Sequence, residues 1–286
     1  MLECVVNLSE GRDPRVLEQL SVAAGDPLLD VHRDRSHHRS VFTLAGPPAT
    51  VEAAARRLAT WAVEHLDLRD HAGVHPRFGV VDVVPFIPLG AGGSAGADLP
   101  LGPAAAARDR FADWAGSELH LPCFLYGPLG AGEVRTLPEV RRRAFATLAP
   151  DRGPPEPDPT SGACAVGARH PLVAYNLSVA DGDLALSRRV AGAVRGPKVR
   201  ALAFDLEGTP QVSINLVEPQ TVGPADVYDE VADRLRDGGA RIAGAELVGL
   251  VPAAILEATP ERRWVELGLT GQATIEGRLA ERVRRR

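Results

Sequence analysis

Residues 70–88 read DHAGVHPRFGVVDVVPFIP, a polar loop that leads into an apolar strand. The first thirteen residues contain two histidines, an arginine and a closing carboxylate, with glycines at 73 and 79 and a proline at 76. The run 83–88 predicts a buried strand entered from a tight loop. A loop of this kind can hold an imidazole rigidly in a cleft for proton transfer, which makes His75 a candidate catalytic residue.

The segments before this loop predict a repeating order of elements. A strand over 3–8 is followed by a helix that Asp13 caps and Pro14 begins. Strands over 28–32 and 40–45, joined by an exposed polar loop over 33–39, precede a helix that opens at Pro48 or Thr50. With the strand after the histidine loop, the order is β-α-β-β-α-β, the split βαβ or ferredoxin-like unit.

The second half of the chain predicts the same order. Strands are expected over 171–178, 199–206, 212–217 and 246–251, with helices over 182–194 and from 224. Three strands share an Asn-Leu pair, at 7–8, 176–177 and 215–216. Between the halves lie a predicted helix over 103–116, a strand over 122–126 and a helix over 137–148. We therefore predict an α+β protein of two ferredoxin-like (βαββαβ) subdomains in tandem, with domains over 1–165 and 166–286.

Composition sets limits on the partners and the compartment. The chain of 286 residues is 45% apolar and 24% charged, with a formal net charge of −5, typical of a globular protein with no general affinity for nucleic acid or acidic membranes. Its three cysteines form no CxxC pair, which favours buried, reduced thiols. The N-terminus lacks the pattern of a signal peptide, and no apolar run is long enough to span a bilayer. We expect a soluble, cytoplasmic protein without nucleic-acid or membrane partners.

The segment 150–162, PDRGPPEPDPTSG, is too rich in proline for a helix or an interior strand. Composition alone leaves two interpretations open. The segment is either a plain linker between domains or a stiffened wall of a ligand cleft.

A second polar cluster, DVHRDRSHHR at residues 30–39, suggests zinc at first sight. Its histidines lack the spacing of a metal site, so no metal is expected, and a polar cleft edge with Arg39 binding an anion is favoured. Asp30 and His32 point the same way on a strand. His71 is either a second polar contact or a residue that faces a helix dipole. Motifs for a serine nucleophile, a dinucleotide and a P-loop are absent.

Several stretches resemble the glutamate formiminotransferase family in the same order along the chain. Residues 71–82 follow the signature H-x-G-x-H-P-R-x-G-x-x-D, and residues 3–11 follow the start E-C-V-x-N-x-S-E-G. Residues 28–31 and 39–43 resemble the second and third strands of the family, and 247–252 its last core strand. Residues 153–162 stand where the family has its folate-binding loop, and are followed by the similar 167–169.

The resemblance implies transfer of a formimino group from N-formimino-L-glutamate to tetrahydrofolate, the co-substrate, in a cleft or channel between two subdomains of a homodimer. It implies His75 as general acid/base and Asp82 as a second catalytic residue. It implies a set of substrate- and folate-binding residues: Asp30, His32, Arg39, Arg77, Gly153, Pro154, Thr160, Ser161, Gly162 and Arg169. It shows no C-terminal four-helix extension, so a cyclodeaminase activity is expected elsewhere.

Two other functions stay open at this point. The chain is alternatively a diverged folate-binding homologue without this activity, or a transferase or hydrolase of another formimino or formyl compound. The intact His75, Arg77 and Asp82 favour an enzyme, whereas the short second half favours divergence.

Overall fold

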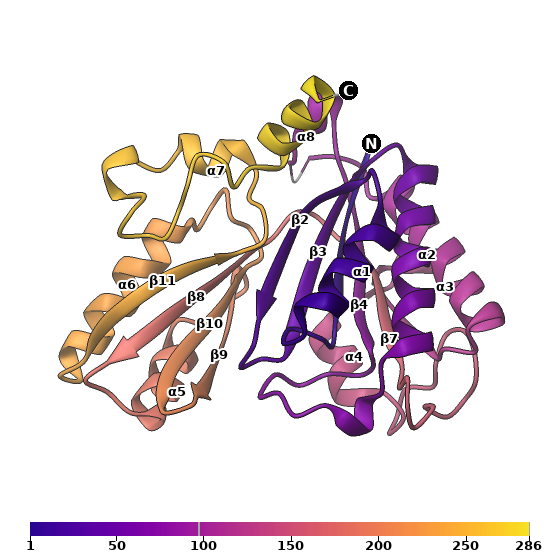
Figure 1. The fold of residues 1–286 in the computed structure, drawn as a ribbon. Coiled ribbons are helices and arrows are strands. Elements are labelled where there is room, and N and C mark those ends of the chain that lie inside the picture. Colours follow the sequence, from indigo (N-terminus) through magenta and orange to yellow (C-terminus); the bar gives the residue numbers. More distant parts are fainter. Residues whose placement is uncertain (97, 286) are drawn as a thin grey trace. The chain divides into compact units, whose positions relative to one another are not determined.

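A computed structural model describes residues 1–96 and 98–285 (Figure 1). The chain forms two compact units. Unit 1 consists of Met1–Gly93 with Asp98–His170, and unit 2 consists chiefly of residues 171–285. Each unit has a sheet of its own. Among the helices of the described residues, none combines the length and the apolar character needed to cross a membrane.

Unit 1 contains a seven-stranded sheet of order β2-β3-β1-β4-β7-β5-β6. Its strands are β1 (Leu2–Leu8), β2 (Leu28–Asp34), β3 (Arg39–Gly46), β4 (Val81–Pro88), β5 (Cys123–Pro128), β6 (Val134–Arg135) and β7 (Cys164–Ala168). Its helices are α1 (Pro14–Ala24), α2 (Pro48–His65), α3 (Gly102–Glu118) and α4 (Leu137–Arg143). Strands β1 to β4 pair antiparallel and form the predicted βαββαβ unit with α1 and α2. Beyond it, β7 pairs parallel with β4, and β5 pairs parallel with β7.

The two faces of this sheet differ in chemistry. Helices α1, α2 and α3 pack on one face over apolar side chains such as Val6 and Phe42. Because side chains alternate along a strand, Asn7 and Thr43 lie on the opposite face, where both are buried. Helix α4 packs on part of that opposite face through Val140. The unit therefore offers a polar sheet face that the first three helices leave uncovered.

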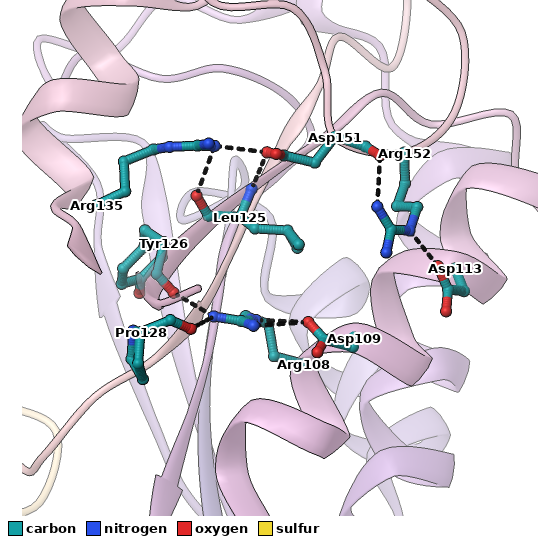
Figure 2. Close-up of polar contacts among 9 residues, drawn as sticks. All are labelled: Arg108, Asp109, Asp113, Leu125, Tyr126, Pro128, Arg135, Asp151 and Arg152. Carbon is teal, nitrogen blue, oxygen red and sulfur yellow. Dashed lines mark hydrogen bonds and ion pairs between the residues drawn. The ribbon is translucent and has the colours of Figure 1, made fainter. Parts of the chain in front are cut away.

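Charged side chains fasten the strands that extend the sheet beyond β4 (Figure 2). The buried Arg108 of α3 donates to the carbonyl oxygens of Pro128 at 2.6 Å and Tyr126 at 3.2 Å, at the end of β5. Arg135 of β6 forms an ion pair with Asp151 at 2.7 Å. A buried cation is tolerated only when its donors are used, so these contacts fix the ends of β5 and β6 against α3 and the segment after α4.

Unit 2 is a four-stranded antiparallel sheet of order β11-β8-β10-β9. Its strands are β8 (Val173–Ala180), β9 (Val199–Leu206), β10 (Thr209–Leu216) and β11 (Arg241–Val248), and its helices are α5 (Leu184–Ala193), α6 (Pro224–Asp237), α7 (Ala253–Glu257) and α8 (Ile275–Arg284). The order of its strands is that of β4, β1, β3 and β2 in unit 1. The prediction of an α+β protein with two subdomains in tandem is thus confirmed, and the elements of both units follow the predicted βαββαβ order.

Some predicted details were wrong. The last predicted strand, 246–251, instead covers Arg241–Val248, because its glycine and alanines hid the true start. The predicted helix over 137–148 ends at Arg143, after which the amides of residues 146–148 all donate to the Arg143 carbonyl. The polar stretch 33–39 is not a wholly exposed loop, since β2 reaches Asp34 and His37 is buried. Strand β7 was not predicted.

Candidate active site

The Arg77 side chain forms hydrogen bonds within the loop between α2 and β4 and holds it in a compact conformation. The Arg77 guanidinium donates to the carbonyl oxygens of His75 at 2.5 Å and Gly73 at 2.7 Å. It also contacts the Nδ1 atom of His71. Arg77 therefore holds the backbone that carries His75, and binding of a substrate carboxylate by this residue stays a prediction.

His71 joins the same loop to the turn between β2 and β3. Its Nδ1 atom accepts from the Gly73 amide at 3.1 Å, and its Nε2 atom lies 2.7 Å from the His38 carbonyl oxygen. This network assigns the proton to Nε2. Burial, chiefly, lowers the pKa of His71 to about 4, so its ring is neutral at pH 7. A Cβ atom at Gly73 would lie 2.2 Å from the His37 carbonyl oxygen, so the two loops approach this closely only at a glycine.

Asp82 holds the other end of the loop. One of its oxygens accepts from the Phe78 amide at 2.7 Å, and the other forms an ion pair with Arg141 of α4 at 2.7 Å. The carboxylate is almost fully buried, and the Arg141 guanidinium also lies over the Phe78 ring, 5.0 Å from its centroid. These contacts hold the Asp82 carboxylate between the Phe78 amide and Arg141, and a catalytic role for Asp82 stays a prediction.

His75 lies between these anchors in a positively charged environment. Its ring centroid is 5.7 Å from that of His37. Burial lowers the pKa of His75 to about 2, and the charges of Arg39 and Arg141 contribute to the shift. The imidazole is therefore neutral at pH 7 in the unliganded protein.

Arg39 begins β3 and supplies a charge on the polar sheet face. Its Nη2 atom donates to the Asn7 Oδ1 atom of β1, whereas its buried Nε atom has no hydrogen-bond partner among the described residues. Burial lowers the pKa of Arg39 to about 10, which leaves the group protonated at pH 7. Asp30 and His32 of β2 pair with Thr43 and Val41 of β3 and share the sheet face of Arg39.

The end of the proline-rich segment is attached to both ends of the loop between α2 and β4. The Leu68 amide donates to the Thr160 carbonyl at 2.8 Å, and the Val80 amide donates to the Ser161 carbonyl at 2.9 Å. A Cβ atom at Gly162, where φ is +73°, would lie 2.2 Å from the Phe78 carbonyl oxygen. The structure thus brings Thr160, Ser161 and Gly162 to the end of the loop that carries His75.

Asp158 gives this turn its shape. Its Oδ1 atom accepts from the amides of Thr160 and Ser161, both at 2.8 Å, and from both hydroxyls, at 2.5 and 3.2 Å. These hydrogen bonds lower the pKa of Asp158 to about 2, and the bond from the Thr160 hydroxyl makes the largest contribution. Because the start of the segment also pairs with β5, through the Cys123 amide and the Arg152 carbonyl at 2.9 Å, both ends belong to unit 1 and the segment is not a linker between the units.

Two groups of predicted site residues lie away from His75. Gly153 packs at the other end of the proline-rich segment, where a Cβ atom would lie 2.5 Å from the Leu121 carbonyl oxygen, and Pro154 follows it. Arg169 follows β7, and its amide donates to the Phe86 carbonyl at 3.1 Å. Phe86 is four residues beyond Asp82 along β4, or about 13 Å at the rise of a strand. The backbone contact of Arg169 therefore lies at the end of β4 away from Asp82.

Sequence reasoning missed Arg141 and Asn7. Arg141 stands in a run of three arginines and comes to Asp82 only through the packing of α4, so no local pattern marked it. Asn7 belongs to the Asn-Leu pair that three strands share, but its contact with Arg39 depends on the pairing of β1 with β3. The described residues contain no group of three or more histidine, cysteine or acidic side chains that could hold a metal ion.

Comparison of the sequence with known protein families shows the family of this chain. The family model described as "Formiminotransferase domain, N-terminal subdomain" matches residues 1–169. The family model described as "Formiminotransferase domain" matches residues 174–262. The chain belongs to the formiminotransferase family. As a member of this family it is an enzyme of the transferase class.

Relatives with names are found among bacteria, archaea and animals. Glutamate formimidoyltransferase of Streptococcus pyogenes serotype M1 is 32% identical over 277 residues, which are 90% of each chain. Glutamate formimidoyltransferase of Thermoplasma acidophilum is 29% identical over 90% of this chain and 89% of its own length. Formimidoyltransferase-cyclodeaminase of Gallus gallus is 34% identical over 90% of this chain, which spans 51% of that relative.

Proposed function

We propose that the chain transfers the formimino group of N-formimino-L-glutamate to tetrahydrofolate, giving 5-formiminotetrahydrofolate and L-glutamate. The observation that carries the proposal is a largely buried, neutral imidazole, that of His75, close to the charges of Arg39 and Arg141 on a loop that Arg77 closes. Membership of the formiminotransferase family supports the identity of the transferred group.

The reaction needs one proton to move twice, and His75 suits both steps. Nitrogen N5 of the pterin forms a bond to the amidine carbon and gives its proton to the neutral His75. The bond between that carbon and the glutamate nitrogen then breaks, and the protonated His75 returns the proton to the departing nitrogen. General acid/base catalysis of this kind contributes about 10²- to 10⁴-fold to the rate.

Bound substrate adjusts the strength of the base in this proposal. A pKa of about 2 makes His75 a weak base, whereas the best catalytic pKa lies near the working pH. Arg39 and Arg141 contribute to that low pKa, and a substrate carboxylate bound by Arg39 would offset the Arg39 charge. Binding of the anionic donor therefore offsets the smaller, charge-related part of the shift and makes His75 a stronger base, while burial, the main cause, remains.

The remaining residues bind and orient the two substrates. The Nε–H group of Arg39, which has no partner among the described residues, is a donor for a carboxylate, and Asp30 and His32 share its sheet face. The proline-rich segment is the folate-binding loop in this proposal. Its residues toward tetrahydrofolate are Gly153 and Pro154 at the start of the segment, and Thr160, Ser161 and Gly162 at its end, beside the loop that carries His75. Orientation of two bound reactants supplies much of the remaining rate.

Initial rates with each substrate omitted in turn test the proposal. Purified protein is mixed with formiminoglutamate and tetrahydrofolate, the folate spectrum is followed, and released glutamate is assayed in the same samples. We expect equal amounts of folate product and glutamate, and neither when one substrate is missing. Glutamate release without tetrahydrofolate would indicate a hydrolase, and saturable folate binding without turnover would indicate a binding homologue.

A further inference from the structure

We propose that Arg141, on helix α4, is a positioning residue for the transfer reaction. Its side chain holds the loop that carries His75. The inference rests on the proposed function, since it assigns His75 the proton transfers. Arg141 itself accepts and gives no proton in those transfers; it acts through its contacts with Asp82, Pro76 and Phe78 and through its charge.

The contacts of Arg141 lie just after His75 in the chain. Its Nη2 atom donates to Asp82 Oδ2 at 2.7 Å, and its Nη1 atom lies 3.4 Å from the Pro76 carbonyl oxygen. Its guanidinium lies over the ring of Phe78, whose amide donates to Asp82 Oδ1. One guanidinium and one carboxylate therefore bind residues 76 and 78, while Arg77 between them binds the carbonyl of residue 75.

The side chain at position 141 must be an arginine for this arrangement. Its planar fork reaches the carboxylate and the carbonyl from two different nitrogens, and its flat face covers an aromatic ring, which the single ammonium of lysine cannot do together. The Asp82 carboxylate is only 2% exposed and Arg141 is 24% exposed, so the pair is shielded at its acidic end. Removal of the guanidinium leaves a buried carboxylate with its amide contact alone, at a cost that the loop can reduce by moving.

The helix that presents Arg141 is itself held in place. Thr136 and Glu139 form a reciprocal capping box at the start of α4, and Val140 packs with Val83 of β4 and Phe124 of β5. These anchors set the direction of the neighbouring Arg141 side chain toward the start of β4.

Arg141 also acts on His75 through its charge. The groups that lower the pKa of His75, besides burial, are Arg39 of β3, Arg141 of α4 and His37 of the turn between β2 and β3. Asp82 of β4 faces the same arginines with the opposite charge. Loss of the Arg141 charge therefore raises the pKa of His75, and it does so in addition to any movement of the loop.

Four variants test this role, with Arg142→Gln as the matched control because Arg142 is the exposed neighbour of Arg141 on the same helix. We expect Arg141→Gln to lower kcat by about 10- to 100-fold with KM for both substrates nearly unchanged, since a misplaced catalytic group costs the chemical step. The acidic limb of its pH–rate profile should move to higher pH. Arg141→Lys should keep the wild-type limb and lose part of kcat, whereas Asp82→Asn should lower kcat as Arg141→Gln does.

A readout that does not need turnover separates this inference from the proposed function. The titration of the His75 ring proton and the exchange protection of the amides of residues 75 and 77–80 are measured by NMR in the wild type, Arg141→Lys, Arg141→Gln and Arg142→Gln. If the wild type does not turn over the substrates, the proposed function fails, and a higher His75 pKa with faster exchange in Arg141→Gln still supports the positioning role. The positioning role would be overturned if Arg141→Gln kept the kcat and the NMR behaviour of the wild type. It would also be overturned if Arg142→Gln showed the same changes as Arg141→Gln. Should Arg141→Gln not fold, Arg141→Lys decides the matter by the same two measurements.

Discussion

Units 1 and 2 share the order of strands and helices but differ in the connection that precedes their fourth strand. In unit 2 this connection is residues 238–240, a tight turn between α6 and β11. In unit 1 it is residues 66–80, which hold His71, His75 and Arg77. The repeated fold therefore supplies a scaffold, and the proposed chemistry lies in a loop that only one copy has.

The two units also differ in the partner of the asparagine on their first strand. Asn7 of β1 accepts from Arg39, whereas the amide nitrogen of Asn176 of β8 lies 3.5 Å from a carboxylate oxygen of Glu246. Both asparagines are buried on the sheet face away from the packed helices. The same position thus faces a positive charge in unit 1 and a negative charge in unit 2, so anion binding is expected in unit 1 alone.

The sharpest test of this comparison removes the imidazole from the long connection. We expect His75→Ala to lower kcat by about 100-fold or more while folate binding and folding are retained, because only proton transfer is lost. His65→Ala, at an exposed position on α2, is the control and should keep wild-type rates. Steady-state kinetics decide the matter, and a His75→Ala variant with more than about a tenth of wild-type kcat removes His75 from the mechanism.

The next test concerns the proline-rich segment, which unit 2 lacks. Replacing Pro154, Pro155, Pro157 and Pro159 by glycine should weaken tetrahydrofolate binding by about 2–4 kcal/mol, from about 0.4–1 kcal/mol of added chain entropy per proline. The fold should persist, since residues 155–159 are exposed and the two ends are hydrogen-bonded to unit 1. Calorimetric titration measures the affinity, and an unchanged dissociation constant would show that the segment is no wall of the folate site.

Substitution of one glycine in each unit compares how closely the backbone is packed at the two positions. Gly73→Ala places a methyl group against the His37 carbonyl and should destabilise the protein by about 1–3 kcal/mol and reduce turnover. Gly196→Ala in unit 2 meets open space and should leave both unchanged. Denaturant unfolding and kinetics report the two effects, and equal losses in both variants would contradict the tight approach of the two loops.

How stability changes with pH should reveal the neutral histidines of unit 1. The pKa values of His75, about 2, and His71, about 4, lie below the unfolded value near 6.5, so the unfolded chain binds more protons in acid. Their contribution is complete above pH 6.5 and is lost as the pH falls toward 4 and below. The melting temperature should therefore drop on acidification in the wild type, and drop less in His71→Gln and His75→Gln. Parallel curves for all three proteins would argue against buried, neutral rings.

The smallest effect is expected from removal of metals. The histidines at 32, 37 and 38 lack the spacing of a metal site, so dialysis against a chelator should leave activity unchanged. Stoichiometric zinc in the purified protein, with activity lost on its removal, would refute this expectation.

Local patterns predicted the elements that depend on their own residues. The cap at Asp13 and Pro14, the alternation in β1 and the amphipathic α2 are encoded within a few positions of the chain. Strand β7, which reads CAVGA, carries no strong strand signal and forms because β4 and β5 flank it. The approach of Arg141 to Asp82 depends on the same extension of the sheet, and so could not be seen from spacing.

In the proposed reaction this chain moves a formimino group from one nitrogen to another, and the fate of the amidine carbon tests that transfer most directly. Formiminoglutamate labelled with ¹³C at the amidine carbon is mixed with tetrahydrofolate and the protein, and the label is followed by NMR. We predict that the label appears on N5 of the folate at the rate at which glutamate is released, and that His75→Ala slows both equally. Label in free formamide or formate, or label that stays on the glutamate, would contradict the account.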